Sequence, residues 1–338
     1  MKSPFAFLFA TGALLFWHST LIAQVTRHEV DVCVYGGTAS GVMAALAAKK
    51  EGANVLIVEP SRWLGGMTGG GINHLDWGKG NTVGGSTYKI LTEGLEDQVR
   101  DHGGHAVVGV GNREYRERFK KAVEERGITV IYDHRLGTAE INDSLIDSPT
   151  RQRPIALNES LAGNNAGNSL QSITLDYAPV DNTGCPIPEP KKCKAVKVSA
   201  KVFIDCSYEG DLLALSGVNY TWGRESREHY SESLAGVRPS LWVHDIDPYI
   251  EPGNPQSGLV PFVQDRKIGP LGSADSLSMG YCFRHEFDMS GKGIPIPEPT
   301  YFKPAEFELY RRAIRDGVDI FSNRHMRTTL NKFTVHKK

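Results

Sequence analysis

The chain reads VDVCVYGGTASG at residues 30–41, and this stretch decides the expected fold. Residues 30–35 are mostly apolar, as in a strand that is buried on both faces. Apolar residues at helical spacing follow over residues 39–51, and Gly52 stands where helices commonly end. A second apolar run at residues 55–58 completes a strand–helix–strand unit. Such a unit normally belongs to a parallel sheet.

The turn between the first strand and the helix is rich in glycine. Gly36 permits backbone dihedral angles that a Cβ atom would forbid, and Gly41 lets the helix pack closely on the strand. The free N–H groups at the start of the helix favour a pyrophosphate group. The turn departs from the dinucleotide-binding pattern G-x-G-x-x-G at Thr38, which takes the place of the second glycine. We therefore expect a dinucleotide to bind Gly36, Gly37, Thr38, Ala39, Ser40 and Gly41.

Glu59 ends the second strand. Its carboxylate can accept hydrogen bonds from both hydroxyls of a ribose, and it would repel a ribose 2′-phosphate. The acid therefore argues against an NADP-type ligand. An ordinary strand–helix–strand unit without a ligand is the alternative interpretation.

A second glycine-rich segment, PSRWLGGMTGGG, follows at residues 60–71. Backbone without side chains can run close to an extended cofactor, and this second segment favours FAD over NAD, whose sites do not need one. We expect Trp63, Leu64 and Met67 to be buried, which argues against a merely flexible loop. The cofactor contacts predicted in this segment are Pro60, Gly65, Gly66 and Met67.

Residues 200–207, AKVFIDCS, resemble a later strand that returns to the nucleotide. Open α/β sheets bind ligands at the carboxyl ends of their strands, so Asp205 would lie near the cofactor. The alternative is that Asp205 caps the helix that follows it.

The remaining pattern predicts the organisation of the chain. Residues 142–168 are polar and rich in Asn, Ser and Gly, which predicts a surface loop. We expect an FAD-binding domain at 24–235 with an inserted loop at 142–194, followed by a partial substrate or cap domain at 236–338. Helices are predicted at 86–101, 112–126, 212–215 and 304–315, and strands at 128–132, 172–177 and 195–204.

The N-terminal residues are typical of a secretory signal peptide. Lys2 precedes a nearly uncharged run at residues 5–23, and Ala23 is a small residue suited to cleavage. We expect residues 1–23 to be removed and the protein to be secreted or periplasmic, with no stable membrane association after cleavage. An uncut membrane anchor is the alternative.

Five cysteines are too few for a disulfide framework. A disulfide between Cys185 and Cys193 could close the proline-rich loop that they flank. Cys33, Cys206 and Cys282 lie in apolar, strand-like contexts and are expected to be buried thiols.

Charge and histidine spacing exclude two classes of partner. The net charge is −1 at pH 7, and no dense run of Lys and Arg precedes the last residues, so no nucleic-acid partner is expected. No metal is expected either, because His102 and His105 lack acidic or cysteine partners.

Several segments occur together, and in the order found in one family. The chain resembles secreted FAD-dependent oxidoreductases of the FAD_oxidored type, of which some are labelled as related to xanthan lyases. The resemblance implies an α/β fold with a glutathione-reductase-type FAD-binding Rossmann domain, a parallel sheet with a crossover β-meander, interleaved with a smaller substrate domain. Relatives continue beyond residue 338, so it also implies C-terminal truncation. The segments that carry it are 36–41, 59–71, Asp76 with 84–85, 203–212, 223–226, 232–237, 281–284 and 294–299.

Flavin chemistry would remove a hydride from a substrate C–H bond, usually with a base that takes the accompanying proton. His74 and Asp76 follow the glycine run and are the candidate bases, whereas Arg284 could hold an anionic substrate. Each of the three also suits a purely structural role. The expected substrate is a small molecule or a carbohydrate. The alternatives are a protein related to polysaccharide (xanthan-type) lyases and a non-catalytic nucleotide-binding remnant.

Overall fold

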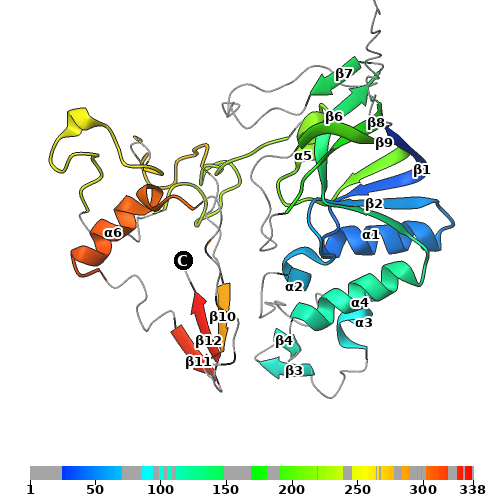
Figure 1. Cartoon of the computed structure of the whole chain (residues 1–338), viewed down its shortest axis with the longest axis horizontal. Coiled ribbons are helices and arrows are strands. Elements are labelled where there is room, and N and C mark those ends of the chain that lie inside the picture. Colours follow the sequence, from blue (N-terminus) through cyan, green and yellow to red (C-terminus); the bar gives the residue numbers. More distant parts are fainter. Residues whose placement is uncertain are drawn as a thin grey trace, which may run out of the picture.

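A computed structural model places the described part of the chain in two sheets, one hairpin and several helices (Figure 1). The described residues are 25–70, 85–93, 99–102, 105–108, 112–142, 144–147, 169–180, 191–218, 220–238, 246–263, 265, 268–277, 284–288, 292, 295, 298, 302–318, 326–329 and 332–336.

The main sheet has seven strands in the order β5-β2-β1-β9-β8-β6-β7. Four of them are parallel to one another, namely β5 (Thr129–Tyr132), β2 (Val55–Glu59), β1 (Thr26–Tyr35) and β9 (Lys191–Asp205). The other three continue the sheet in antiparallel pairing, namely β8 (Leu170–Tyr177), β6 (His134–Ile141) and β7 (Ser144–Asp147). The predicted α/β class, a parallel sheet extended by a meander, is therefore confirmed.

The predicted strand–helix–strand unit is present at the centre of this sheet. β1 leads into helix α1 (Ala39–Lys50), which returns the chain to β2 beside β1, with Val34 opposite Ile57. Gly52 has a φ of +91° and follows the end of α1, as expected for a glycine that ends a helix.

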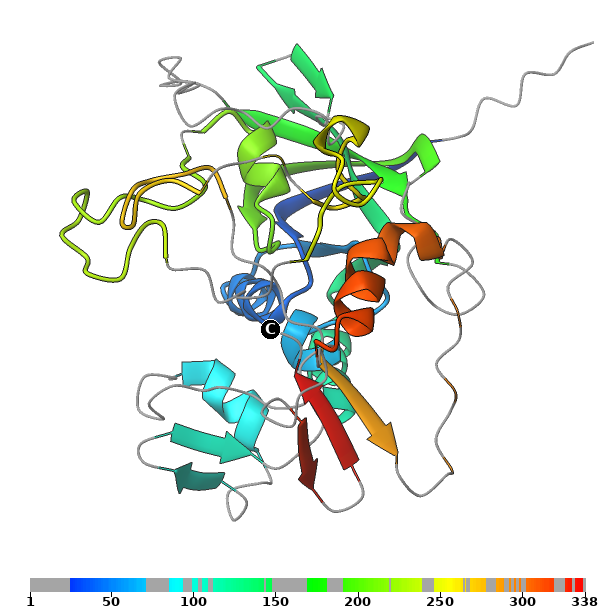
Figure 2. The ribbon, with the colours of Figure 1, turned by 90° about the vertical axis from the view of Figure 1, so that its left-hand side faces the viewer.

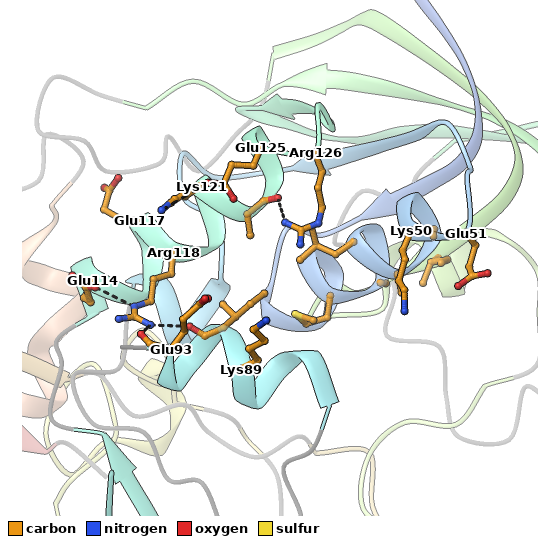
Figure 3. Close-up of a pocket in the computed structure, with 18 residues that line it drawn as sticks. Lys50, Glu51, Lys89, Glu93, Glu114, Glu117, Arg118, Lys121, Glu125 and Arg126 are labelled. Carbon is orange, nitrogen blue, oxygen red and sulfur yellow. Dashed lines mark hydrogen bonds and ion pairs between the residues drawn. The ribbon is translucent and has the colours of Figure 1, made fainter. Parts of the chain in front are cut away.

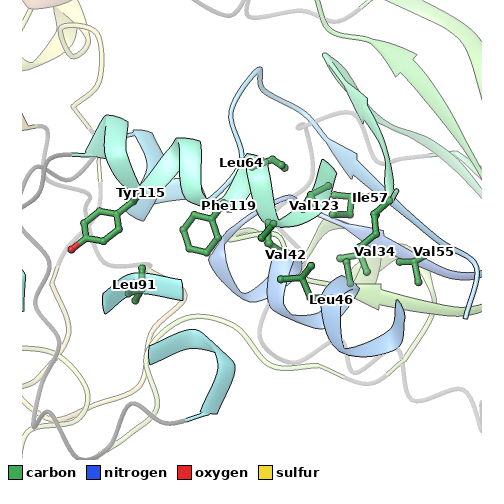
Figure 4. Packing of buried hydrophobic residues seen from close by; sticks show 13 residues of the cluster. Val34, Val42, Leu46, Val55, Ile57, Leu64, Leu91, Tyr115, Phe119 and Val123 are labelled. Atoms are coloured by element: carbon green, nitrogen blue, oxygen red, sulfur yellow. The ribbon is translucent and has the colours of Figure 1, made fainter. Parts of the chain in front are cut away.

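Both faces of the sheet are covered by apolar side chains. On one face, α1 and α4 (Asn112–Glu124) pack on β1 and β2, and Figure 4 shows Phe119 of α4 beside Val42 of α1. On the other face, the short helix α5 (Asp211–Leu215) contributes Leu212 and Leu215 to a cluster with Cys33 and Tyr35 of β1. Alternate residues of β1 and β2 thus reach opposite layers, so the carboxyl ends of these strands are held firmly in place.

Smaller elements lie beside this core. They are α2 (Gly66–Gly70), α3 (Gly85–Thr92), the hairpin of β3 (Val99–His102) and β4 (His105–Val108), and the short helices η3 (Pro255–Ser257) and η4 (Pro304–Phe307). Helix α6 (Glu308–Arg315) and a sheet of β10 (Arg284–Asp288), β12 (Lys332–His336) and β11 (Met326–Thr329) lie to one side of the main sheet (Figures 1 and 2). Within the described ranges, no helix is both long and apolar enough to cross a membrane.

The prediction of a single helix at 86–101 was wrong in part. The helix expected at 86–101 ends at Thr92, and residues 99–102 form a strand paired with 105–108. The missed signal was Gly94, because glycine commonly follows the last turn of a helix.

The segment at 142–194, expected as an inserted loop, contains strands of the main sheet, and the strand predicted at 172–177 is confirmed as part of β8. Residues 144–147 form β7, residues 170–177 form β8, and β9 already begins at Lys191, so all three belong to the main sheet. Asn142 has a φ of +47° and lies between β6 and β7, where asparagine favours a tight hairpin turn.

Candidate functional site

Two glycines at the turn after β1 lie where a side chain cannot be accommodated. Gly36 has a φ of +98°, and a Cβ atom on it would lie 2.7 Å from the backbone nitrogen of Ser207. A Cβ atom on Gly41 would overlap the carbonyl oxygen of Gly36. The structure therefore requires glycine at both positions, for the reasons that the sequence suggested.

The N-terminus of α1 is capped from within the chain. Thr38 is the N-cap residue, and its Oγ1 accepts a hydrogen bond from the backbone nitrogen of Gly41 at 3.2 Å. The same hydroxyl donates to the carbonyl oxygen of Cys206 at 2.8 Å. Thr38 is buried, Ala39 is half-buried and Ser40 is exposed, and the Ser40 hydroxyl lies 2.9 Å from that of Thr38.

Glu59 is directed at this turn. Its side chain is buried, and Oε2 accepts from the backbone nitrogen of Gly37 at 2.7 Å while Oε1 accepts from that of Ser61 at 2.7 Å. Burial raises the pKa of Glu59, and the hydrogen bonds from Ser61 and Gly37 oppose that rise. Each carboxylate oxygen has a second lone pair, so Glu59 can still accept hydrogen bonds from ribose hydroxyls.

The second glycine-rich segment lies against the first. The backbone nitrogen of Gly65 donates to the carbonyl oxygen of Gly37 at 2.8 Å, and Leu64 is fully buried beside them. Gly65 has a φ of +94°, and a Cβ atom on it would lie 2.5 Å from the ring of Phe119. Pro60, which joins Glu59 to this segment, is half-buried. The structure thus brings both predicted cofactor-binding segments to one edge of the sheet.

Trp63 and Met67 are not buried as expected. Trp63 is 48% exposed and Met67 is 43% exposed, whereas Leu64 alone of the three is buried. The guanidinium group of Arg116 lies 4.0 Å from the centre of the Trp63 ring, so a cation covers one face of the indole. Helix α4 supplies this contact, and nothing in the local sequence of residues 60–71 indicates it.

Tyr208 is a site residue that sequence reasoning missed. Its hydroxyl oxygen accepts a hydrogen bond from the backbone nitrogen of Met67 at 2.8 Å, and a Cβ atom on Gly66 would overlap that hydroxyl. Tyr208 therefore joins the end of β9 to the start of α2. The available signals were its position three residues after Asp205, at the end of a predicted strand, and its place in the segment 203–212 that carries the family resemblance.

Asp205 caps helix α5, which was the alternative interpretation of this residue. Its Oδ2 accepts from the backbone nitrogen of Leu213 in α5 at 2.8 Å, and its Oδ1 accepts from both the backbone nitrogen and the hydroxyl of Ser207. Asp205 is paired with Tyr35 in the register of β9 and β1, so it lies at the same edge of the sheet as the turn.

The candidate catalytic residues are not brought together by the described structure. His74 and Asp76 lie outside the described residues, and Arg284 is placed by its backbone in β10, opposite His336. Their roles remain predictions.

The structure allows the predicted burial of two cysteines, Cys33 and Cys206, to be checked. Cys33 is fully buried and burial raises its pKa to about 12, so its thiol is un-ionised at neutral pH. Cys206 is half-buried, and burial raises its pKa as well. Cys185 and Cys282 lie outside the described residues, and Cys193 is placed only by its backbone in β9.

A groove of about 1270 Å³ lies between α1, α3 and α4 (Figure 3). None of the residues that line it belongs to the glycine-rich turn. Arg118 bridges its wall, donating to the carbonyl oxygens of Ile90 and Glu93 and pairing with Glu114. The groove is therefore separate from the candidate cofactor site.

One of the comparisons with known proteins identifies a family. A family profile described as FAD dependent oxidoreductase matches residues 31–160 and 186–336. The search of curated proteins gave no significant match.

Solved structures show distant similarity. THI4 of Thermovibrio ammonificans has 15% identity and a TM-score of 0.34, over 55% of this chain and 61% of that chain. A geranylgeranyl bacteriochlorophyll reductase-like protein of Thermoplasma acidophilum has 16% identity and a TM-score of 0.32, over 57% of this chain and 43% of that chain. The chain spans less than two thirds of the length of either structure. The family match, by contrast, extends over most of the sequence, and the chain belongs to the FAD dependent oxidoreductase family.

Proposed function

We propose that this chain binds the adenosine diphosphate half of FAD at the N-terminus of α1 and oxidises a small or carbohydrate-like substrate by removal of a hydride. The observation that carries this proposal is the turn at residues 36–41 with Glu59 directed at it. The family match supports the same cofactor.

The residues of the turn fit FAD. Gly36 and Gly41 bring the backbone of β1, α1 and β9 closer together than side chains would permit, so backbone N–H groups can reach a phosphate. Glu59 retains acceptor capacity for the ribose, and its negative charge would repel a 2′-phosphate.

FAD, when bound, supplies an acceptor for a hydride. The chain's own residues have separate tasks. The backbone N–H groups at the helix N-terminus, that of Ser40 among them, would bind the pyrophosphate, and Glu59 would orient the ribose. His74 or Asp76 would take the proton that the substrate's O–H or N–H group loses, and Arg284 would hold an anionic group of the substrate.

The experiment is to load the full chain with FAD, remove free cofactor and record the visible spectrum. We expect a bound flavin spectrum that is bleached when a suitable sugar or small alcohol is added without oxygen. His74→Gln and Asp76→Asn should leave the flavin bound, and the variant that has lost the base should bleach more slowly. A chain that stays colourless under every loading condition would refute the proposal.

We also propose that the protein is exported, since Lys2 and the apolar run at residues 5–23 are typical of a signal peptide. Mass spectrometry of the N-terminus in a secreting host tests this. Export with cleavage predicts a mature chain that begins at or near Gln24. An intact N-terminus in the membrane fraction would instead show an uncut anchor.

A further inference from the structure

Thr38 stands where the dinucleotide-binding pattern has its second glycine, and its side chain points into the protein. The glycine of that pattern allows the backbone to approach the pyrophosphate closely. Thr38 has a φ of −63° and a ψ of 175°, which any residue adopts, so its backbone does not require glycine. Only 6% of Thr38 is exposed, so its side chain leaves the open side of the turn clear.

The hydroxyl of Thr38 joins three separate parts of the site. It donates its one hydrogen to the carbonyl oxygen of Cys206 at 2.8 Å. It accepts from the backbone nitrogen of Gly41 in the first turn of α1 at 3.2 Å. The remaining contact, 2.9 Å to the hydroxyl of Ser40, must then be donated by Ser40, because Thr38 has no second hydrogen to give. One side chain thus connects the turn, α1 and the end of β9.

These bonds hold the turn together without a ligand. In their absence, the amide of Gly41 and the carbonyl group of Cys206 would have to find other partners at the N-terminus of α1. A ligand that binds a loose turn must also order it, and that entropy cost lowers its affinity. A turn that is already ordered binds the same phosphates more tightly.

We propose that Thr38 is a positioning residue: its hydroxyl holds the phosphate-binding turn in its binding conformation before the cofactor arrives, and its side chain does not itself contact the phosphate. The effect that this inference predicts on FAD binding rests on the proposed function. The claim that the Thr38 hydroxyl orders the turn concerns the chain without FAD.

The test uses the full chain and the variants Thr38→Val and Thr38→Ser. Thr38→Val keeps the shape but loses the hydroxyl, whereas Thr38→Ser keeps the hydroxyl. Without FAD, we expect amide hydrogen exchange over residues 38–46 to be about tenfold faster in Thr38→Val and close to wild type in Thr38→Ser. The dissociation constant for FAD should rise by about tenfold in Thr38→Val and be restored in Thr38→Ser.

A matched control separates positioning from general stability. Thr138 on β6 is also buried, and its hydroxyl is bonded to that of Thr174. Thr138→Val should lower the melting temperature without changing FAD affinity or exchange over residues 38–46. If it changes both as much as Thr38→Val does, the effect is one of general stability and the inference is wrong.

Thr38→Gly keeps the test decisive if Thr38→Val does not fold. It restores the glycine of the pattern, so we expect faster exchange without FAD and weaker binding than in wild type. Unchanged exchange and unchanged affinity in Thr38→Gly would overturn the inference. A wild-type chain that binds no FAD would instead refute the proposed function, and the exchange comparison would still test the role of Thr38.

Discussion

The substitution Gly41→Ala tests most sharply how the turn is built. It adds a single carbon atom to the first turn of α1, and that atom would overlap the carbonyl oxygen of Gly36 and lie 3.2 Å from Cβ of Cys206. The obstructing group is backbone and not the end of a flexible side chain. Helix α1 must therefore move away from β1 and β9.

The expected magnitude has two parts. Overpacking of this kind costs about 1–3 kcal/mol of folding stability. Displacement of α1 also moves its N–H groups away from the phosphates, and each hydrogen bond to a charged group contributes about 1.5–3 kcal/mol. Loss of one such bond raises the dissociation constant for FAD by roughly 10- to 150-fold.

The assay is a titration of FAD followed by flavin fluorescence, at a temperature where circular dichroism shows each variant to be folded. Ala47→Leu is the control, because Ala47 is an exposed residue of the same helix and the larger side chain does not meet β1. We expect the control to bind FAD like wild type. A folded Gly41→Ala variant with wild-type affinity would show that close packing of α1 on the turn is not needed.

Three further predictions concern other groups at this edge of the sheet. Burial raises the pKa of Glu59 above 4.5, so the folded state binds its proton more tightly than the unfolded chain does, and the free energy of unfolding should fall as the pH rises from about 4.5 through the raised pKa. Glu59→Gln should remove this fall in urea unfolding at several pH values, and an identical pH dependence in both proteins would contradict the assignment. Tyr208→Phe removes the acceptor of the Met67 amide and should raise the dissociation constant for FAD by about 2- to 10-fold, whereas unchanged binding would mean that this contact does not order α2. Because the pKa of the buried Cys33 is about 12, a thiol reagent should label it only after unfolding, and peptide mass mapping that finds it labelled in the native chain as fast as Cys206 would contradict its burial.

The central strand–helix–strand unit could be predicted because its constraints are local. Gly36 and Gly41 are required by clashes with neighbouring backbone, and the apolar runs on either side leave few alternatives to buried strands. Glu59 was placed correctly at the end of β2 for the same reason. What its carboxylate contacts, the amides of Gly37 and Ser61, depends on the turn geometry and was not predicted.

The errors lie where distant segments meet. Trp63 was expected to be buried, but its environment depends on Arg116, which comes from α4. Tyr208 contacts Met67 across a separation that no local pattern encodes. Thr38 was predicted to bind the cofactor and was noted as a departure from the glycine pattern. Its hydrogen bond to the carbonyl group of Cys206 was not predicted, because that partner is 168 residues away.

Competition between ligands tests most directly whether the α1 turn binds the adenosine diphosphate half of FAD. The full chain is loaded with FAD, and release of flavin is measured on addition of ADP and, separately, of FMN. We predict that ADP displaces FAD and that FMN, which lacks the adenosine half, does so far more weakly. Displacement by FMN with no effect of ADP would contradict the assignment of the turn and of Glu59.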